Sequence, residues 1–240
     1  MATKNEFKRV DGRKLDEMRA ITAKVGVVPN ADGSAMFAFG DTVAIAAVYG
    51  PRLLHPQHMQ NPQKGILRVA YDLMSFSVYE RKRPGPSRRS KEISKVTEWA
   101  LEPAVDLKAF PNTVIDVQIY ILQADAGTRT AGINAASMAL AHAGIPMKDL
   151  ICSVAPGKNG QAIISDLNKE EEDYDEGEGA TDFAVAKLAN QDEYTLMQMD
   201  GKIQPERVKE ILDIAEKNCE TIYDAQKKAL KEVVNPEGKK

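Results

Sequence analysis

The chain has 240 residues, a length sufficient to bury a hydrophobic core. Of these residues, 43% are hydrophobic and 28% are charged. Its formal net charge of −3 excludes a uniformly basic nucleic-acid-binding protein, so any contact with nucleic acid must come from a local patch. Lys4, Glu6 and Lys8 interrupt the apolar run that a signal peptide needs, and no apolar stretch reaches the roughly 20 residues of a membrane span, so we expect a soluble cytoplasmic protein without membrane contact.

The first quarter of the chain shows short apolar runs separated by Gly and Asp turns. These runs are Ile21–Val28, Ser34–Phe39 and Thr42–Tyr49. Such a pattern is typical of an antiparallel meander. A further strand is expected at Leu67–Phe76.

Apolar residues then recur every three or four positions over Ile93–Phe110, which predicts a helix with one apolar face. Pro103 lies inside this pattern. Because an interior proline costs about 3 kcal/mol and kinks a helix, we expect a bend there. A strand at Thr113–Gln123 and an Ala-rich, closely packed helix at Thr128–Ala143 follow.

The second half repeats the order of sheet and then helix. Strands are expected at Asp149–Val154 and Gln161–Asp166, a hairpin at Asp182–Asp200, and a long amphipathic helix at Val208–Ala229. The repetition predicts an α+β fold with two sheet-plus-helix lobes in one compact domain. We place this domain at residues 1–235, its lobes at about residues 9–145 and 146–232, and a disordered tail at residues 236–240.

The first candidate site is a basic segment at residues 80–95, which carries seven positive and two negative side chains. Arg88 and Arg89 fall where Ser87 or Ser90 could cap the following helix. Arginine side chains beside the free N–H groups of a helix N-terminus suit phosphate. A solvated charge run flanking a helix explains the composition equally well.

The second candidate is the turn between a predicted strand and the Ala-rich helix. Gly127 lets the backbone approach a ligand, Thr128 supplies a hydroxyl and an N–H, and Arg129 supplies a bidentate guanidinium. Inorganic phosphate fits such a turn, although the GxxxxGK[ST] pattern of a P-loop is lacking. The alternative is an ordinary strand-to-helix turn capped by Thr128.

The third candidate is acidic, with eight carboxylates and no basic residue from Glu170 to Asp182. Clustered carboxylates can hold a divalent metal or donate a proton in phosphoryl transfer, and Asp182, at the start of an apolar strand, is the one best placed. A solvated acidic loop is the alternative.

Other residue types give weaker signals. His55 and His58 are interpreted as turn residues rather than zinc ligands, and Cys152 and Cys219 as free thiols. The aromatic residues Tyr71, Phe76 and Tyr79 could stack on bases, although strand aromatics more often pack in a core.

In chain order, these motifs resemble the RNase PH family, and within it the catalytic subunits of archaeal exosomes. The resemblance runs from about Arg9 to Ala229. It is carried by Val10-Asp11-Gly12-Arg13 with Asp16 and Arg19, by Pro84-Gly85-Pro86-Ser87-Arg88-Arg89, and by Leu122-Gln123-Ala124-Asp125-Ala126-Gly127-Thr128-Arg129, followed by Ala143-Gly144-Ile145-Pro146-Met147 and Asp166-Leu167-Asn168.

The resemblance implies roles for particular residues. Gly127, Thr128, Arg129 and Arg89 would hold phosphate, and Arg88 and Arg68 would grip the RNA backbone. Asp182 matches the second of the family's two active-site aspartates. The first is expected six residues earlier, where this chain has Glu176, so that Asp175 or Asp173 is the candidate. Asp182 and Asp175 are the candidate Mg²⁺ ligands.

The resemblance also implies an activity and partners. The expected reaction is phosphorolytic 3′-to-5′ degradation of single-stranded RNA to nucleoside diphosphates, with 3′-tail addition as its reverse. The partners would be a paralogous inactive subunit in a hetero-hexameric ring and RNA-binding cap proteins. The alternatives are a homohexameric RNase PH that trims tRNA 3′ ends and an inactive, RNA-binding ring subunit.

Overall fold

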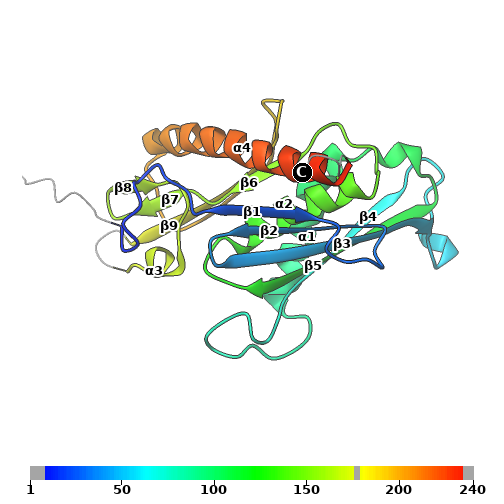
Figure 1. Ribbon diagram of the computed structural model, residues 1–240, viewed down its shortest axis with the longest axis horizontal. Coiled ribbons are helices and arrows are strands. Elements are labelled where there is room, and N and C mark those ends of the chain that lie inside the picture. Colours follow the sequence, from blue (N-terminus) through cyan, green and yellow to red (C-terminus); the bar gives the residue numbers. More distant parts are fainter. Residues whose placement is uncertain (1–8, 176–178, 235–240) are drawn as a thin grey trace, which may run out of the picture.

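Two mixed α/β layers stand side by side beneath one long helix (Figure 1). The computed structural model describes residues 9–175 and 179–234, and the predicted tail at residues 236–240 lies outside them. The first sheet has the strand order β1-β2-β3-β5-β4, and its members are β1 (Ile21–Val25), β2 (Gly33–Phe39), β3 (Thr42–Leu53), β4 (Ile66–Leu73) and β5 (Thr113–Gln123). All neighbouring strands in it are antiparallel except β4 and β5. The predicted meander is therefore confirmed.

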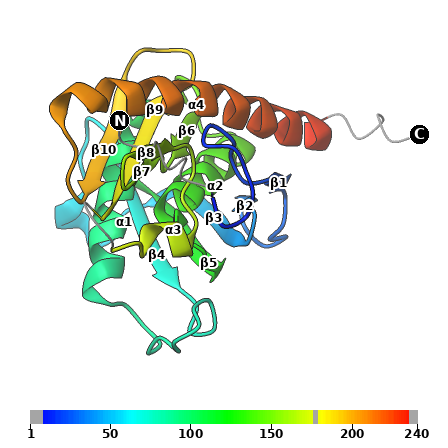
Figure 2. The ribbon, with the colours of Figure 1, turned by 90° about the vertical axis from the view of Figure 1, so that its left-hand side faces the viewer.

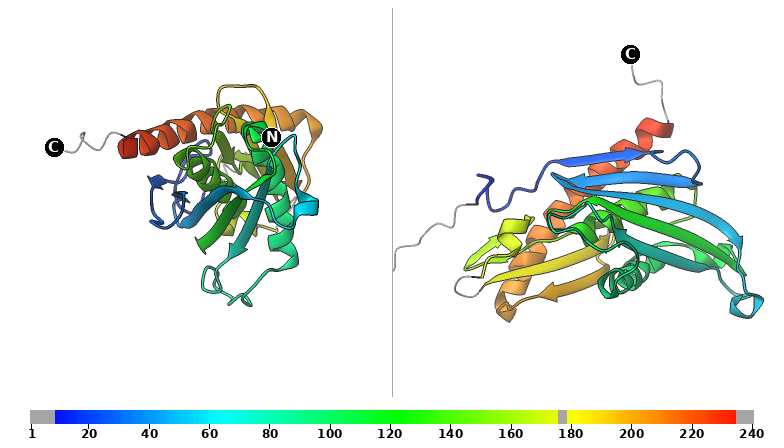
Figure 3. Two further views of the ribbon diagram at one scale, coloured as in Figure 1. Left: turned by 90° about the vertical axis from the view of Figure 1, so that its right-hand side faces the viewer. Right: turned by 90° about the horizontal axis from the view of Figure 1, so that it is seen from below.

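The second sheet has the order β10-β9-β7-β8, with β6 also pairing with β9. Its strands are β6 (Ile151–Val154), β7 (Gly157–Asn159), β8 (Ala162–Ile164), β9 (Ala180–Leu188) and β10 (Tyr194–Asp200). The strand predicted at Gln161–Asp166 shortens to β8, and the sequence pattern missed β7. Figure 3 shows the two sheets from below.

The helices join the sheets to each other. The Ala-rich helix α2 (Thr128–His142) is buried along Thr130–Leu140 and packs against strands of both sheets. A helix that is buried all round must have small or apolar residues on every face, which the Ala-rich sequence provides. The long helix α4 (Pro205–Val234) contacts β1 and β6, and its C-terminal end extends past the body (Figure 2). The predicted α+β fold is thus confirmed.

The helix predicted over Ile93–Phe110 is wrong in its second half. Helix α1 (Arg88–Leu101) ends before Pro103, which lies in the 3₁₀ turn η2 (Glu102–Ala104), and a further 3₁₀ turn, η3 (Leu107–Ala109), follows. Proline lacks the N–H for the helical hydrogen bond and its ring clashes with the preceding turn. The α-helix therefore stops at this point rather than bending.

Smaller predictions are also resolved. His58 lies in the exposed 3₁₀ turn η1 (Gln57–Met59), and Cys152 and Cys219 are buried free thiols. None of the helices in the described residues combines the length and the apolar character needed to cross a bilayer.

Candidate active site

The N-terminal ends of α1 and α2 open onto one cavity of about 630 Å³, which is also lined by β9 and by the short helix α3 (Lys169–Glu172). Six of the candidate phosphate-binding and catalytic residues line it: Arg89, Gly127, Thr128, Arg129, Asp173 and Asp182. They come from positions almost a hundred residues apart. The structure therefore brings the basic, turn and acidic candidates together.

The N-terminus of α1 is capped by its own serines. The Ser87 hydroxyl accepts from the Ser90 N–H at 3.0 Å, and the Ser90 hydroxyl accepts from the Ser87 N–H at 2.7 Å. This reciprocal pair fixes the first turn, which carries the exposed side chains of Arg88 and Arg89. Arg89 lines the cavity, whereas Arg88 does not.

The N-terminus of α2 has no side-chain cap within the described residues, so Thr128 does not cap the helix. Gly127 is the N-cap residue, with φ 62°, and Ala126 before it has φ 53°. An uncapped helix N-terminus leaves N–H groups free to bind an anion. The Nε of Arg129 is buried and finds no hydrogen-bond partner among the described residues. Because buried donors are rarely left unpaired, this turn is suited to an anionic ligand.

The acidic run is not simply a solvated loop. Asn168 and Glu171 form a capping box that starts α3, and the Glu171 carboxylate is buried against Arg9, with the Arg9 Nε donating to it at 2.7 Å. Glu172 and Asp173 line the cavity, and Lys169 pairs with Asp173 at 2.6 Å. An Asn-x-x-Glu pattern is a recognisable helix start, and it was the signal available in the sequence.

The candidates for the first active-site aspartate differ in position. Asp173 lines the cavity. Asp175 is exposed and is not among the residues that line it. Glu176 lies outside the described residues. Glu172 faces the cavity as well and was not predicted from the sequence.

Asp182 is the third residue of β9 and faces the cavity. Burial raises its pKa to about 6, and repulsion from the Glu172 carboxylate adds to the rise. The positive charges of Arg129 and Arg89 act in the opposite direction and lower the pKa. A carboxyl group that titrates near neutral pH can give or take a proton during a reaction.

Arg68 is not part of the cavity. It lies on β4 opposite Asp116 of β5, and its Nη2 donates to Asp116 at 2.9 Å. Both side chains are at least partly exposed. Arg68 therefore faces solvent on the outside of the first sheet.

The aromatic residues divide into two kinds. Tyr71 is 3% exposed and packs in the core, and its burial raises the pKa of its hydroxyl to about 12. Phe76 and Tyr79 lie in the segment of residues 74–87 that projects between β4 and α1 (Figures 1 and 2), and both are strongly exposed. Tyr79 also lines the cavity, together with Lys82 of the basic segment and Lys169, the latter not singled out by the sequence patterns.

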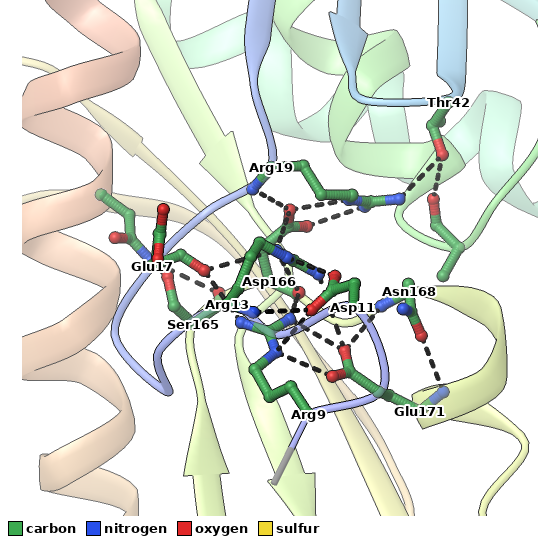
Figure 4. Close-up of polar contacts among 12 residues, drawn as sticks. Arg9, Asp11, Arg13, Glu17, Arg19, Thr42, Ser165, Asp166, Asn168 and Glu171 are labelled. Atoms are coloured by element: carbon green, nitrogen blue, oxygen red, sulfur yellow. Dashed lines mark hydrogen bonds and ion pairs between the residues drawn. The ribbon is translucent and has the colours of Figure 1, made fainter.

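A network of buried ion pairs backs the cavity (Figure 4). Arg19, just ahead of β1, donates to Asp166 from Nε and Nη2, both at 2.8 Å. Arg9 donates to Glu171 in the same bidentate manner. Arg9 and Arg19, which precede the first strand β1, therefore connect the first sheet to the segment that follows β8.

The donor set can be compared with the needs of Mg²⁺. In the described residues, His, Cys, Asp and Glu side chains form no cluster of three or more, so a cage made of protein ligands alone is not present. Mg²⁺ commonly takes one or two carboxylates and completes its shell with water and substrate phosphates. Asp182 and Glu172 lie close enough for the Glu172 charge to repel Asp182, and Asp173 lines the same cavity, so the carboxylates present fit this smaller requirement.

Comparisons with known proteins identify related sequences. The sequence profile of the 3′ exoribonuclease family RNase PH, domain 1, matches residues 17–146, and the profile of domain 2 matches residues 149–218. The chain is 54% identical over 225 residues to the exosome complex component Rrp41 of Thermococcus kodakarensis, with 94% of this chain and 89% of the relative covered. It is 48% identical over 223 residues to Rrp41 of Nitrosopumilus maritimus, with coverage of 93% and 90%.

Solved structures share the fold. Rice Rrp46 superposes with a TM-score of 0.80 at 25% identity, covering 92% of this chain and 100% of that one. A chain of the Archaeoglobus fulgidus exosome with RNA bound to the active site superposes with a TM-score of 0.76 at 24% identity, covering 90% and 92%.

The raised pKa of Asp182 makes a prediction about stability. The pKa of Asp182 is about 6 in the folded chain and 3.8 in the unfolded chain. Its contribution to the free energy of unfolding is therefore present at low pH and is lost as pH rises through this interval. Asp182→Asn removes the cost of burying the charge, so we expect it to raise the free energy of unfolding by about 1–2 kcal/mol at about pH 8. The gain should disappear below about pH 3, where Asp182 is protonated in both the folded and the unfolded chain. Urea unfolding at both pH values measures it.

Asp173→Asn is the matched control for this prediction, because Asp173 is exposed and paired with Lys169. It should bring no gain at either pH. Equal or lower stability of Asp182→Asn at high pH would show that Asp182 does not bear the cost of a buried charge.

Proposed function

The chain belongs to the 3′ exoribonuclease family of RNase PH type, and on this premise we propose that it is the catalytic subunit of an archaeal exosome. It degrades single-stranded RNA from the 3′ end by phosphorolysis and releases nucleoside diphosphates. The observation that carries the proposal is the shared cavity, where the uncapped N-terminus of α2 and Arg89 lie beside Asp182. The relatives named exosome complex component Rrp41 support the assembly.

Enzymes of this family use inorganic phosphate as a co-substrate. In the proposed mechanism, Gly127, Thr128 and Arg129 bind phosphate through the free N–H groups, the hydroxyl and the guanidinium. Arg89 on α1 lines the same cavity and contributes a second guanidinium to the anion. These contacts neutralise the anion and orient one of its oxygens, and in phosphoryl transfer such positioning and charge neutralisation supply most of the catalysis.

Asp182 acts at the leaving oxygen. A phosphate oxygen attacks the terminal phosphodiester, the bond from phosphorus to the 3′ oxygen breaks, and the terminal nucleotide leaves as its diphosphate. The shortened RNA then needs a proton on its 3′ oxygen. With a pKa of about 6, Asp182 is protonated in part of the molecules at neutral pH and can supply that proton.

A second carboxylate completes the acidic side of the cavity. We propose Asp173 or Asp175 for this role, with Asp173 favoured because it lines the cavity. Asp182 and the chosen partner would also be the ligands of Mg²⁺. When bound, the metal would supply positive charge beside the phosphates of the substrate.

RNA leads away from the cavity across basic side chains. Arg88, exposed beside Arg89, would contact a phosphate close to the reacting end, and Arg68, outside the cavity, one further along the strand. Contacts to phosphates carry no direct sequence information, so little sequence preference is expected.

We propose that the chain works in the cytoplasm in a six-membered ring, alternating with an inactive paralogue, with RNA-binding cap proteins on one face. Trp99, with 58% of its surface exposed, and Tyr120, with 41%, are large side chains that a partner could cover. The retained Arg129 and Asp182 argue against an inactive subunit.

The test of the proposed function is its dependence on phosphate. The assembled protein should shorten single-stranded RNA only in the presence of phosphate and release nucleoside diphosphates. When nucleoside diphosphates replace phosphate, it should instead extend the RNA. Chromatography of the nucleotide products measures both directions. Equal degradation without phosphate, yielding monophosphates, would refute phosphorolysis.

The arginines and Asp182 should separate binding from turnover. Arg88→Ala and Arg68→Ala should each weaken RNA binding, because each removes one phosphate contact. The slope of log K against log salt concentration should become shallower by about one unit in each variant. Asp182→Asn should bind RNA normally and turn it over poorly. Filter binding at several salt concentrations, with turnover measured on the same preparations, distinguishes the two. An unchanged salt slope for Arg68→Ala would remove Arg68 from the RNA path.

Assembly should control activity. One chain offers one short basic segment, whereas a ring places several around a common channel and raises the effective concentration of bound RNA. We therefore expect the isolated chain to bind and degrade RNA poorly and to gain most of its activity with its paralogue. Light scattering and an exonuclease assay on the same mixtures measure this. A fully active, processive monomer would contradict it.

A further inference from the structure

The turn of Gly127, Thr128 and Arg129, here called the phosphate turn, is supported by residues that do not line the cavity. Arg19 is 8% exposed, and the guanidinium that binds Asp166 also donates from Nη1 to the Asp125 backbone carbonyl. The same Nη1 lies 3.3 Å from the Asp125 carboxylate. One buried guanidinium therefore contacts both the segment after β8 and the segment that leads into α2.

The backbone of this turn needs such support. Ala126 and Gly127 are consecutive residues with positive φ, and alanine adopts this conformation only at a cost in free energy because of its Cβ. The Thr42 hydroxyl lies 2.8 Å from the Asp125 carbonyl and 2.7 Å from that of Ala126, and it accepts from the Asp125 N–H at 3.0 Å. These contacts hold the turn in the conformation that presents Thr128 and Arg129 (Figure 4 shows Arg19 and Thr42).

The Asp125 side chain reaches the first residue of α3, the helix that bears carboxylates of the cavity. Its Oδ1 accepts from the backbone N–H of Lys169 at 3.0 Å. Lys169 is the first residue of α3, which carries Glu172 to the cavity and leads into Asp173. Asp125 thus joins the turn that precedes the anion site to the helix that bears the carboxylates.

We propose that Asp125 is a positioning residue for the reaction, a role that rests on the proposed function. Held by Arg19, it sets the distance between the phosphate turn and α3. It thereby places the phosphate nucleophile relative to the carboxylates at the leaving oxygen. It belongs to neither the phosphate contacts nor the acidic group.

The test compares two substitutions in the assembled full-length chain. Asp125→Ala loses both the contact to Arg19 and the acceptor for Lys169, and we expect it to raise the KM for phosphate about tenfold while the KM for RNA stays unchanged. Asp125→Asn keeps an oxygen that can accept from the Lys169 N–H, so its KM for phosphate should rise by only about two- to threefold.

Gln226→Ala is the control for a purely structural effect. Gln226 is fully buried and donates to Asn134 and to the Ile151 carbonyl, away from the cavity. Its loss should lower the melting temperature and leave the KM for phosphate unchanged. A KM for phosphate at the wild-type value in Asp125→Ala would overturn the proposal, as would equal increases in Asp125→Asn and Gln226→Ala.

If Asp125→Ala does not fold, the Asp125→Asn variant carries the test, with a wild-type KM for phosphate overturning the proposal. If the wild-type protein shows no phosphate-dependent activity, the proposed function itself has failed, and this result is distinct from any difference among the variants.

Discussion

The ion pair between Arg19 and Asp166 is the interaction on which the arrangement of the site depends. Both side chains are buried, and burying a charge is costly unless it is paired and hydrogen-bonded. Here the guanidinium and the carboxylate meet through two hydrogen bonds of 2.8 Å, and the Arg19 N–H adds a third at 3.1 Å. Removing either partner would leave an uncompensated charge between the two sheets. The pair therefore fixes how the acidic segment after β8 faces the turn ahead of α2.

The cavity is built from opposite charges held a short distance apart. Arg89 and Arg129 come from the first turns of α1 and α2, and the carboxylates come from α3 and β9. The pKa of Asp182 reflects both groups, because burial and the Glu172 charge raise it while the Arg129 and Arg89 charges lower it. An anion bound by the arginines would remove part of the positive charge that lowers this pKa. Binding of phosphate and protonation of Asp182 should therefore favour each other.

Part of the cavity lining could be predicted because its parts are local in the sequence. Gly127, Thr128 and Arg129 follow a strand directly, and Ser87 and Ser90 were the two candidate caps of α1, so short-range patterns located the N-terminal ends of both helices. The C-terminal end of α1 was missed because the apolar spacing continues past Pro103. The helical hydrogen bonds do not continue there, since proline has no N–H to donate. Helix α3 was missed because its acidic composition hid the cap made by Asn168. The pairing of Arg9 with Glu171, 162 residues apart, depends on the tertiary fold and leaves no local pattern.

The proposed function requires an anion at the uncapped N-terminus of α2, in the cavity that Asp182 also lines. The most direct measurement is the anomalous scattering of arsenic in crystals of the protein soaked in arsenate, which has the charge and shape of phosphate. We expect an anomalous peak within hydrogen-bonding reach of the Thr128 and Arg129 N–H groups and of the Arg89 and Arg129 guanidinium groups. A peak elsewhere, with none at this turn, would contradict it.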